Sequence, residues 1–402
     1  VKADVSQESR ERGYRENLAL LDRWLPRMAN DPAYNRNLSL KDRQCAIETE
    51  VYAHWDVHFN DRARVLGFPV DQFGCGQHRV IRPLSVLEQH VQIQMGIMPD
   101  SMTGRLPEIP ELARMEPDIL LLQSFVHNDQ LQALELFKRY FRARRVFTLD
   151  DLMTEIPSKS PVKTYADFGD RLRRALRFCD RLIVTTEPLR QAYGDFIDDI
   201  VVLPNYLERA AWEGLQPLRR QGTKPRVGWA GAQQHHGDLE LMVEVVKATT
   251  KEVDWVFMGM CPDELKPYVA EERPAVPFAR YPEALARLNL DLAVAPLEIN
   301  RFNEAKSNLR ILEYGAMGWP VVCTDIEPYK GAPVTRVPNE TQAWIEAIRA
   351  HVHDLDAAEG EGDRLRQWVY RHWMLEDHLD EWMAALIGEV RQRADLSVGE
   401  AR

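Results

Sequence analysis

The sequence predicts an α/β protein with two doubly wound parallel sheets in tandem, preceded by a helical segment. Short apolar runs alternate with helical stretches from about residue 77 onward, and this alternation is typical of βαβ units. The runs are continuously apolar, as expected for strands that are covered on both faces. Ligands of such sheets bind beyond the carboxyl ends of the strands. We therefore expect the ligand site in a cleft between the two sheets.

Composition limits the classes of function. The chain has 402 residues, enough for roughly two to three domains. Its 51 basic and 62 acidic residues give a formal net charge of −11, which argues against a general nucleic-acid-binding surface. No apolar run approaches the ~20 residues of a membrane span. The five cysteines are widely spaced, so we expect neither a disulfide framework nor a zinc site, and a reducing cytoplasm is favoured.

The chain divides into regions of different pattern. Residues 1–72 are polar and helical without an expected strand, residues 73–206 form the first sheet domain, and residues 207–375 form the second. The expected strands of the first sheet are residues 80–81, 118–122, 145–149, 181–185 and 199–203. Those of the second sheet are residues 226–230, 255–258, 276–278, 292–295 and 320–324. A polar segment with Gly and Pro, residues 213–225, is the expected linker.

Residues 300–325 contain the most informative chemical pattern. A helix is expected over residues 307–317, with Ser307 as its N-cap. Gly318 and Pro320 end this helix, and an apolar strand follows.

The start of this helix is unusually basic. Lys306 and Arg310 lie there, although cations at a helix N-terminus oppose the helix dipole by roughly 0.3–1 kcal/mol each. They become favourable when a phosphate binds to them and to the free N–H groups. Glu313 follows on the same face, at a distance that suits the two hydroxyls of a ribose. The alternative is a surface ion pair between Arg310 and Glu313.

Residues 228–239 form the first turn of the second series. Gly228 and Gly231 form a GxxG pattern between a strand and a helix, and glycine there lets the backbone approach a ligand closely. The pattern is neither a dinucleotide fingerprint nor a P-loop. His235 and His236 in this turn either contact the ligand or are ordinary polar loop residues.

Two adjacent carboxylates follow an expected strand of the first sheet. Asp150 and Asp151 come directly after residues 145–149, so they would point into the cleft. There they could orient an acceptor hydroxyl, take its proton or hold a metal; otherwise they cap the next helix. His127, after the preceding strand, is a second cleft candidate, with an ordinary loop position as the alternative.

These motifs together resemble the donor-binding region of GT-B glycosyltransferases, close to the retaining glycosyltransferase family 4. The resemblance rests on residues 306–322, KSNLRILEYGAMGWPVV, and covers about residues 77–395. The supporting matches are residues 227–238, residues 201–205 (VVLPN) and residues 147–151 (FTLDD), the last as in O-antigen-type enzymes. The resemblance implies two Rossmann-like domains, with a final helix in residues 376–402 that crosses back onto the first.

The resemblance implies transfer of a sugar from a nucleoside-diphosphate-sugar, such as a UDP- or GDP-sugar, to a hydroxyl of a glycan or lipid-linked glycan. It implies retaining chemistry without a metal or any cofactor besides the donor. Lys306, Ser307 and Asn308 would meet the diphosphate, and Glu313 the ribose. The candidate donor-binding residues are Gly231, Ala232, His235, His236, Arg280, Lys306, Ser307, Asn308, Arg310 and Glu313. The candidate catalytic residues are Asp150, Asp151, His127 and Glu304.

The chain also departs from the family pattern. The E-x7-E pair of the family would need Glu where this chain has Ala305, with Glu304 one residue away. The basic residues of the family's glycine loop are replaced, among others by His235 and His236, and Asp150 stands where many members have His. These departures keep open an inverting enzyme with Asp150 or Asp151 as base. They also keep open a catalytically silent GT-B module that binds nucleotide or glycan as a scaffold.

The N-terminal region has a resemblance of its own. Residues 24–40 resemble the segment that follows a GT-A domain in large polysaccharide glycosyltransferases, and the chain begins with Val1 instead of Met. We therefore expect the C-terminal part of a longer protein with an upstream GT-A domain. The expected location is the cytoplasm, with peripheral association at the inner face of a membrane as an open alternative, and no nucleic-acid partner is expected.

Overall fold

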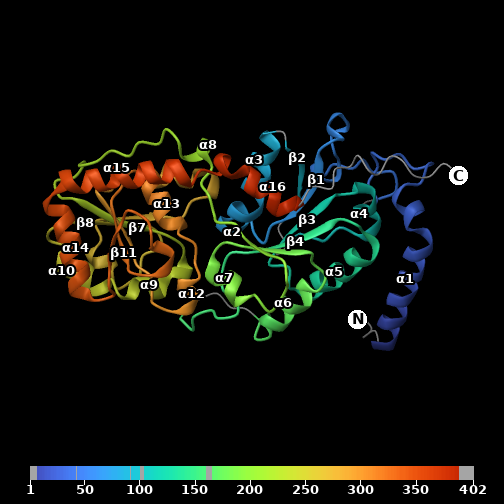
Figure 1. The fold of residues 1–402 in the computed structure, drawn as a ribbon, viewed down its shortest axis with the longest axis horizontal. Coiled ribbons are helices and arrows are strands. Elements are labelled where there is room, and N and C mark those ends of the chain that lie inside the picture. Colours follow the sequence, from blue (N-terminus) through green and yellow to red (C-terminus); the bar gives the residue numbers. More distant parts are fainter. Residues whose placement is uncertain (1–6, 42, 91, 100–103, 160–164, 389–402) are drawn as a thin grey trace.

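The computed structural model describes residues 7–41, 43–90, 92–99, 104–159 and 165–388. It contains two six-stranded parallel sheets, with strand orders β2-β1-β3-β4-β5-β6 and β12-β11-β10-β7-β8-β9. Each sheet forms the centre of one lobe, and the two lobes lie side by side along the long axis of the molecule (Figure 1). The predicted α/β class with two Rossmann-like domains is confirmed.

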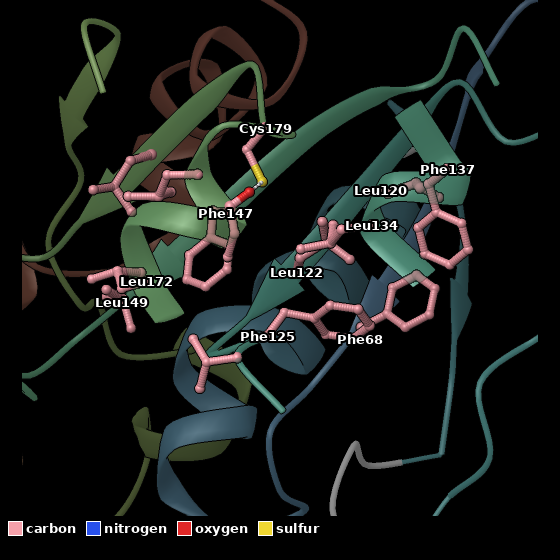
Figure 2. Packing of buried hydrophobic residues seen from close by; sticks show 14 of the residues in the cluster. Phe68, Leu120, Leu122, Phe125, Leu134, Phe137, Phe147, Leu149, Leu172 and Cys179 are labelled. Carbon is pink, nitrogen blue, oxygen red and sulfur yellow. Dashed lines mark hydrogen bonds between the residues drawn. The ribbon is translucent and has the colours of Figure 1, made fainter. Parts of the chain in front are cut away.

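The first lobe has a core on each face of its sheet. Its strands are β1 (Ala63–Phe68), β2 (Ile93–Ile97), β3 (Ile119–Gln123), β4 (Arg144–Leu149), β5 (Arg181–Val184) and β6 (Ile200–Val202). Its helices are α2 (Gly74–Gly76), α3 (Arg82–Gln89), α4 (Ile109–Met115), α5 (Asn128–Tyr140), α6 (Phe168–Leu176) and α7 (Glu187–Ala192). Figure 2 shows one of the two cores, where Leu122 of β3 lies near Phe68 and Phe125, and Phe147 of β4 lies near Leu149 and Leu172. Burial on both faces explains why the strands are continuously apolar.

The N-terminal region differs from the sequence prediction. Helix α1 (Gln7–Ala29) is present and packs against α4, with Leu21 and Ala29 buried. The expectation of a helical segment without strands is wrong beyond α1, because β1 (Ala63–Phe68) lies within residues 1–72 and pairs with both β2 and β3. The first lobe therefore begins before residue 73.

The strand predicted at residues 80–81 is also wrong. These residues belong to a π-helical turn, Gln77–Ile81, which continues into α3. A pair of apolar residues has no period of its own. Here Val80 packs under the sheet from a helix instead of forming part of it.

The second lobe repeats the same architecture. Its strands are β7 (Arg226–Ala230), β8 (Asp254–Gly259), β9 (Glu271–Pro274), β10 (Leu292–Ala295), β11 (Val321–Thr324) and β12 (Thr335–Val337). Its helices are α8 (Arg209–Trp212), α9 (His236–Glu240), α10 (Val243–Thr249), α11 (Tyr281–Ala286), α12 (Arg301–Glu304), α13 (Leu309–Ala316), α14 (Thr341–His353) and α15 (Leu355–His372). The strand predicted at residues 276–278 is wrong. The edge strand β9 lies a few residues earlier, and its charged sequence, EERP, conceals it.

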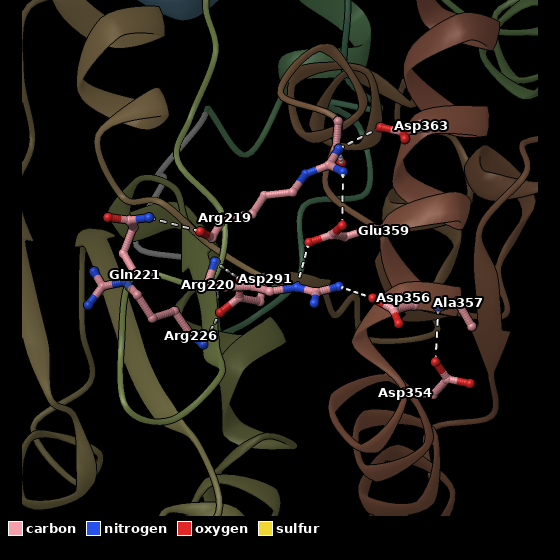
Figure 3. Close-up of polar contacts among 11 residues, drawn as sticks. Arg219, Arg220, Gln221, Arg226, Asp291, Asp354, Asp356, Ala357, Glu359 and Asp363 are labelled. Carbon is pink, nitrogen blue, oxygen red and sulfur yellow. Dashed lines mark hydrogen bonds and ion pairs between the residues drawn. The ribbon is translucent and has the colours of Figure 1, made fainter.

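The segment predicted as a linker is held against the second lobe. Arg219 forms an ion pair with Asp363 of α15 at 2.7 Å, and Arg220 forms one with Glu359 at 2.8 Å (Figure 3). The backbone N–H of Arg220 also donates to Asp291 Oδ1 at 2.7 Å. These contacts tie residues 213–225 to α15.

The chain connects the lobes at one place. Leu207 and Met374 form a parallel bridge, with hydrogen bonds from Leu207 N to Trp373 O at 2.9 Å and from Leu375 N to Leu207 O at 2.8 Å. After this second crossing, helix α16 (Leu379–Ile387) packs against the first sheet, where Trp382 joins its core. Figure 1 shows α15 along the second lobe and α16 beside α3 of the first.

Arg79 is fully buried where these segments meet. Its Nε donates to Thr148 Oγ1 of β4 at 3.2 Å, and its Nη1 donates to Leu203 O at 2.9 Å and Asn205 Oδ1 at 3.1 Å. The guanidinium carbon lies 5.3 Å from the centre of the Trp382 ring. A buried charge that loses a hydrogen-bond partner lowers the free energy of unfolding strongly. Because the partners of Arg79 lie in β4 and directly after β6, and its ring contact lies in α16, this side chain holds the three segments together.

Two glycines of α15 give a matched test of the packing in the second lobe. A Cβ at Gly362 would lie 2.1 Å from Gly318 O, whereas a Cβ at Gly360 would meet only Arg364 Nη1 at 3.7 Å. We expect Gly362→Ala to lower the free energy of unfolding by about 1–3 kcal/mol, because a backbone atom must move. Gly360→Ala should raise it by about 0.5–1 kcal/mol through helix propensity. Urea denaturation measures both, and equal effects would contradict the close approach.

Candidate functional site

The loops after parallel strands of the two lobes contact each other. Thr186, which follows β5, donates from Oγ1 to Ala305 O at 2.7 Å. Asn205, which follows β6, donates from Nδ2 to Ser307 Oγ at 3.2 Å. Two ion pairs continue this contact: Glu155 with Arg301 at 3.0 Å and Lys159 with Glu240 at 2.6 Å. The segment before α13 therefore faces the carboxyl ends of the first sheet, where ligands of such sheets bind.

Asp150 and Asp151 provide an acidic pair on the first lobe. Both follow β4 directly and are half-buried. Burial and the Asp151 charge raise the pKa of Asp150 to about 6, against the opposing effect of Arg79. Burial also raises the pKa of Asp151, and the ammonium of Lys306 opposes this shift. Adjacent carboxyl groups with different neighbours are suited to separate acid and base roles.

Lys306 and Arg310 provide cations on the second lobe. Among the described residues, neither has a carboxylate within 4.0 Å. The Nζ of Lys306 lies 5.1 Å from the centre of the Phe302 ring. Arg310 donates from Nη1 to Ala230 O, and its guanidinium carbon lies 5.0 Å from the centre of the Trp229 ring.

The helix beside these cations begins later than predicted. Helix α13 starts at Leu309, with Asn308 at its N-cap and without a side-chain capping bond. The prediction of Ser307 as the N-cap is wrong, because its hydroxyl accepts the hydrogen bond from Asn205 across the cleft. Ser307 is thus engaged with the other lobe instead of with its own helix.

Glu313 is buried on α13 and is not part of a surface pair. Its side chain is bonded by Tyr281, whose hydroxyl donates to Glu313 Oε2 at 2.9 Å. Burial raises the pKa of Glu313 to about 7, although Arg310 and the Tyr281 hydrogen bond act in the opposite direction. The described residues contain no ion pair within 4.0 Å between Arg310 and Glu313, so the alternative of a surface pair fails.

The glycine turn lies against the cations. A Cβ at Gly231 would be 2.8 Å from Arg310 Nη1 and 2.5 Å from the Trp229 ring, so glycine permits this approach. Next to it, Ala232 is exposed. His235 Nδ1 lies 2.8 Å from Asp238 Oδ2. His236 begins α9, but its side chain lies outside the described part of the structure.

Three other candidates are not brought into this cluster. His127 starts α5, and its Nδ1 lies 2.5 Å from the Tyr165 hydroxyl. Glu304 and Arg280 are exposed. Within the described residues, none of the three has a hydrogen bond or ion pair to the carboxylates or cations above.

Sequence reasoning missed three residues that shape the site. Arg79 acts on Asp150, and Tyr281 bonds Glu313; both are distant in sequence from their partners and follow no local pattern. Asp238 was also missed, although its position three residues after His235 is a helical spacing that could have indicated it.

Two properties of the described part of the chain bear on metals and membranes. No group of three or more His, Cys, Asp or Glu side chains there is arranged to hold a metal ion. None of its helices combines the length and the apolar character that crossing a membrane requires.

The arrangement of lobes is the GT-B fold, as solved structures show. HepE of Anabaena in complex with UDP and glucose superposes with a TM-score of 0.56 at 12% identity, covering 80% of this chain and 98% of that chain. Sucrose-phosphate synthase from Thermosynechococcus elongatus gives 0.57 at 12% identity, covering 80% and 97%. TarM gives 0.51 at 14% identity, covering 68% of this chain and 56% of that one. Neither a protein-family model nor a curated protein sequence matches the chain.

The buried carboxyl group of Glu313 predicts a pH dependence of stability. The folded protein holds this proton up to a pKa of about 7, whereas the ordinary value is 4.5. The contribution of protonated Glu313 to the free energy of unfolding is thus fully present below pH 4.5, and it is lost as the pH rises through 7. Glu313→Gln should become more stable than the wild type over this interval, by up to about 3 kcal/mol.

Urea denaturation at several pH values measures this difference. The matched control is Glu283→Gln, at an exposed position on α11, for which the same subtraction should stay within experimental error. A Glu313→Gln difference that is constant between pH 4.5 and pH 8 would show that the buried carboxyl does not hold its proton.

Proposed function

We propose that the chain is a glycosyltransferase that moves a sugar from a nucleoside-diphosphate-sugar to a hydroxyl of a glycan or lipid-linked glycan. In this proposal the donor is a UDP- or GDP-sugar, the sugar keeps its anomeric configuration, and the reaction does not require a metal ion. It extends to the family 4 relationship, to polysaccharide or O-antigen synthesis, to an upstream GT-A domain and to action in the cytoplasm, with peripheral association at the inner face of a membrane as an alternative.

One observation supports this function above the others. Lys306 and Arg310 have no carboxylate partner within 4.0 Å among the described residues, and Lys306 of the second lobe acts on Asp151 of the first. The chain as a whole has a net charge of −11, so a local basic site for a polyanion stands out from its surroundings. A diphosphate fits the cations, and an acceptor hydroxyl fits the carboxylates.

The proposed roles follow from these charges. Lys306 and Arg310 stabilise the charge that develops on the leaving diphosphate. Glu313 accepts hydrogen bonds from ribose hydroxyls, with Tyr281 holding its carboxylate in place. Asp150 or Asp151 orients the acceptor hydroxyl, and closure of the lobes excludes water that would otherwise hydrolyse the donor. The similar HepE structure is a complex with UDP and glucose, which supports a UDP-sugar as the first donor to test.

A catalytically silent module that binds nucleotide or glycan is the second candidate. Ala305 is buried in the core cluster of the first lobe, at the position where the family resemblance calls for a carboxylate. The neighbouring Glu304 is exposed. A protein of this kind would bind the donor without turning it over.

Donor binding is tested by thermal denaturation with a panel of nucleoside diphosphates. A ligand at a hundredfold excess over its Kd adds about 2.7 kcal/mol of stability, so UDP or GDP should raise Tm measurably. Lys306→Met should remove most of that shift. Lys247→Met, at an exposed lysine of α10 paired with Glu244, should keep it. A panel without any shift in the wild type would contradict the transferase and a nucleotide-binding module.

Turnover separates the two candidates. Asp150→Asn or Asp151→Asn, whichever residue orients the acceptor hydroxyl, should lower kcat by about 10²-fold through loss of that orientation, while the UDP-dependent rise in Tm remains. Release of UDP from UDP-sugars, with and without glycan acceptors, provides the assay. Asp129→Asn, at an exposed position on α5, is the control. Binding without turnover in the wild type would favour the silent module.

A further inference from the structure

His235 and Asp238 form a dyad whose geometry defines one proton position. Asp238 is 5% exposed, and its Oδ1 accepts from Glu298 N at 2.9 Å and from Asn303 Nδ2 at 2.8 Å. Its Oδ2 lies 2.8 Å from His235 Nδ1. An ionised carboxylate only accepts hydrogen bonds, so Nδ1 must be the protonated nitrogen. Nε2 therefore presents a lone pair, and among the described residues it makes no hydrogen bond.

The groups around the imidazole keep it neutral in the free protein. Lys306 and Arg310 act on it from the segment that begins α13, Asp238 bonds it from α9, and the Trp229 ring of β7 lies 6.2 Å away. Burial, followed by the charges of Lys306 and Arg310, lowers the pKa of His235 to about 3, and Asp238 opposes this shift. A proton on Nε2 is thus disfavoured by the same two cations that would bind a diphosphate.

A bound diphosphate would act against the effect of these two cations. A terminal phosphate has a second pKa of about 6, so at pH 8 the ligand is almost fully ionised and brings its negative charges to Lys306 and Arg310. Their repulsion of an imidazolium is then offset, and a phosphate oxygen can accept a hydrogen bond from Nε2.

We propose that His235 is the proton-accepting residue of the donor pocket: its Nε2 takes up a proton when a nucleoside diphosphate binds and releases it when the diphosphate leaves. This inference rests on the proposed function and deepens it. The proton comes from solvent and returns to solvent, so no other reactant is needed. The imidazolium becomes a third cation of the pocket only while the phosphates are present, which couples release of the product to loss of a proton.

Isothermal titration calorimetry of UDP binding tests this coupling. Titrations at each pH from 6.5 to 8.5, in buffers with different heats of ionisation, give the number of protons taken up per UDP; GDP replaces UDP if the thermal panel shows that only GDP binds. We expect the wild type to take up more protons than His235→Gln, by up to about one proton per UDP. Its log Kd should therefore rise more steeply with pH than that of His235→Gln, by up to about one unit per pH unit.

Two variants make the comparison specific. Asp150 and Glu313, with raised pKa values of about 6 and about 7, can exchange protons as well, so the quantity tested is the difference from wild type at each pH. His353→Gln, on α14 and 70% exposed, should match the wild type. His235→Lys should restore affinity without proton uptake, because its charge is permanent; a merely structural role for the ring would not be rescued in this way.

Each outcome decides between the two proposals. If UDP binds and His235→Gln takes up as many protons as the wild type, the role of His235 is wrong and the proposed function stands. If neither UDP nor GDP binds to the wild type, both are wrong. Should His235→Gln fail to fold, the ¹⁵N shift of the His235 ring in the wild-type protein gives the answer. Movement of Nε2 to the protonated range on addition of UDP supports the proposal, and an unchanged shift overturns it.

Discussion

The buried guanidinium of Arg79 is the interaction on which the geometry of the cleft depends. It joins β4, the junction after β6 and the returning helix α16 through its hydrogen bonds and its position over Trp382. Burial lowers its pKa to about 10, and the carboxylate of Asp150 acts against this shift. The same cation limits the rise in the pKa of Asp150. A residue that contacts three segments therefore also acts on the pKa of a carboxyl group at the candidate site, against the larger effects of burial and Asp151.

At the contact between the lobes, a cation of the second lobe acts on a carboxyl group of the first. Lys306 counteracts the rise in the pKa of Asp151 across the gap, and neutral hydrogen bonds such as Thr186 to Ala305 lie beside it. Because the molecule is acidic overall, its long-range field repels anions, whereas a short-range basic site attracts them once they are close. Such an arrangement favours ligands that carry concentrated negative charge over anions in general.

The sequence predicts the strands best where both faces of a strand are buried. The internal strands β3, β4, β7 and β10 are continuous apolar runs, and they were predicted within one or two residues. The strands that were missed or misplaced are mostly at sheet edges, where β2, β9 and β12 have one free side and mixed polarity. Asp150, a candidate residue, directly follows β4 as predicted. Arg79 could not be predicted, because its partner Asn205 is 126 residues away and only the folded chain brings them together.

The paired crossings at Leu207 and Met374 have a consequence for motion. Both passages of the chain between the lobes lie next to each other and are hydrogen-bonded to each other, while α15 stays with one lobe and α16 with the other. A connection at a single point permits rotation about that point but resists sliding of the lobes past each other. Any rotation of the lobes about this paired connection would therefore displace most the part of the lobe contact that lies farthest from it, and it would have to separate pairs such as Glu155 and Arg301.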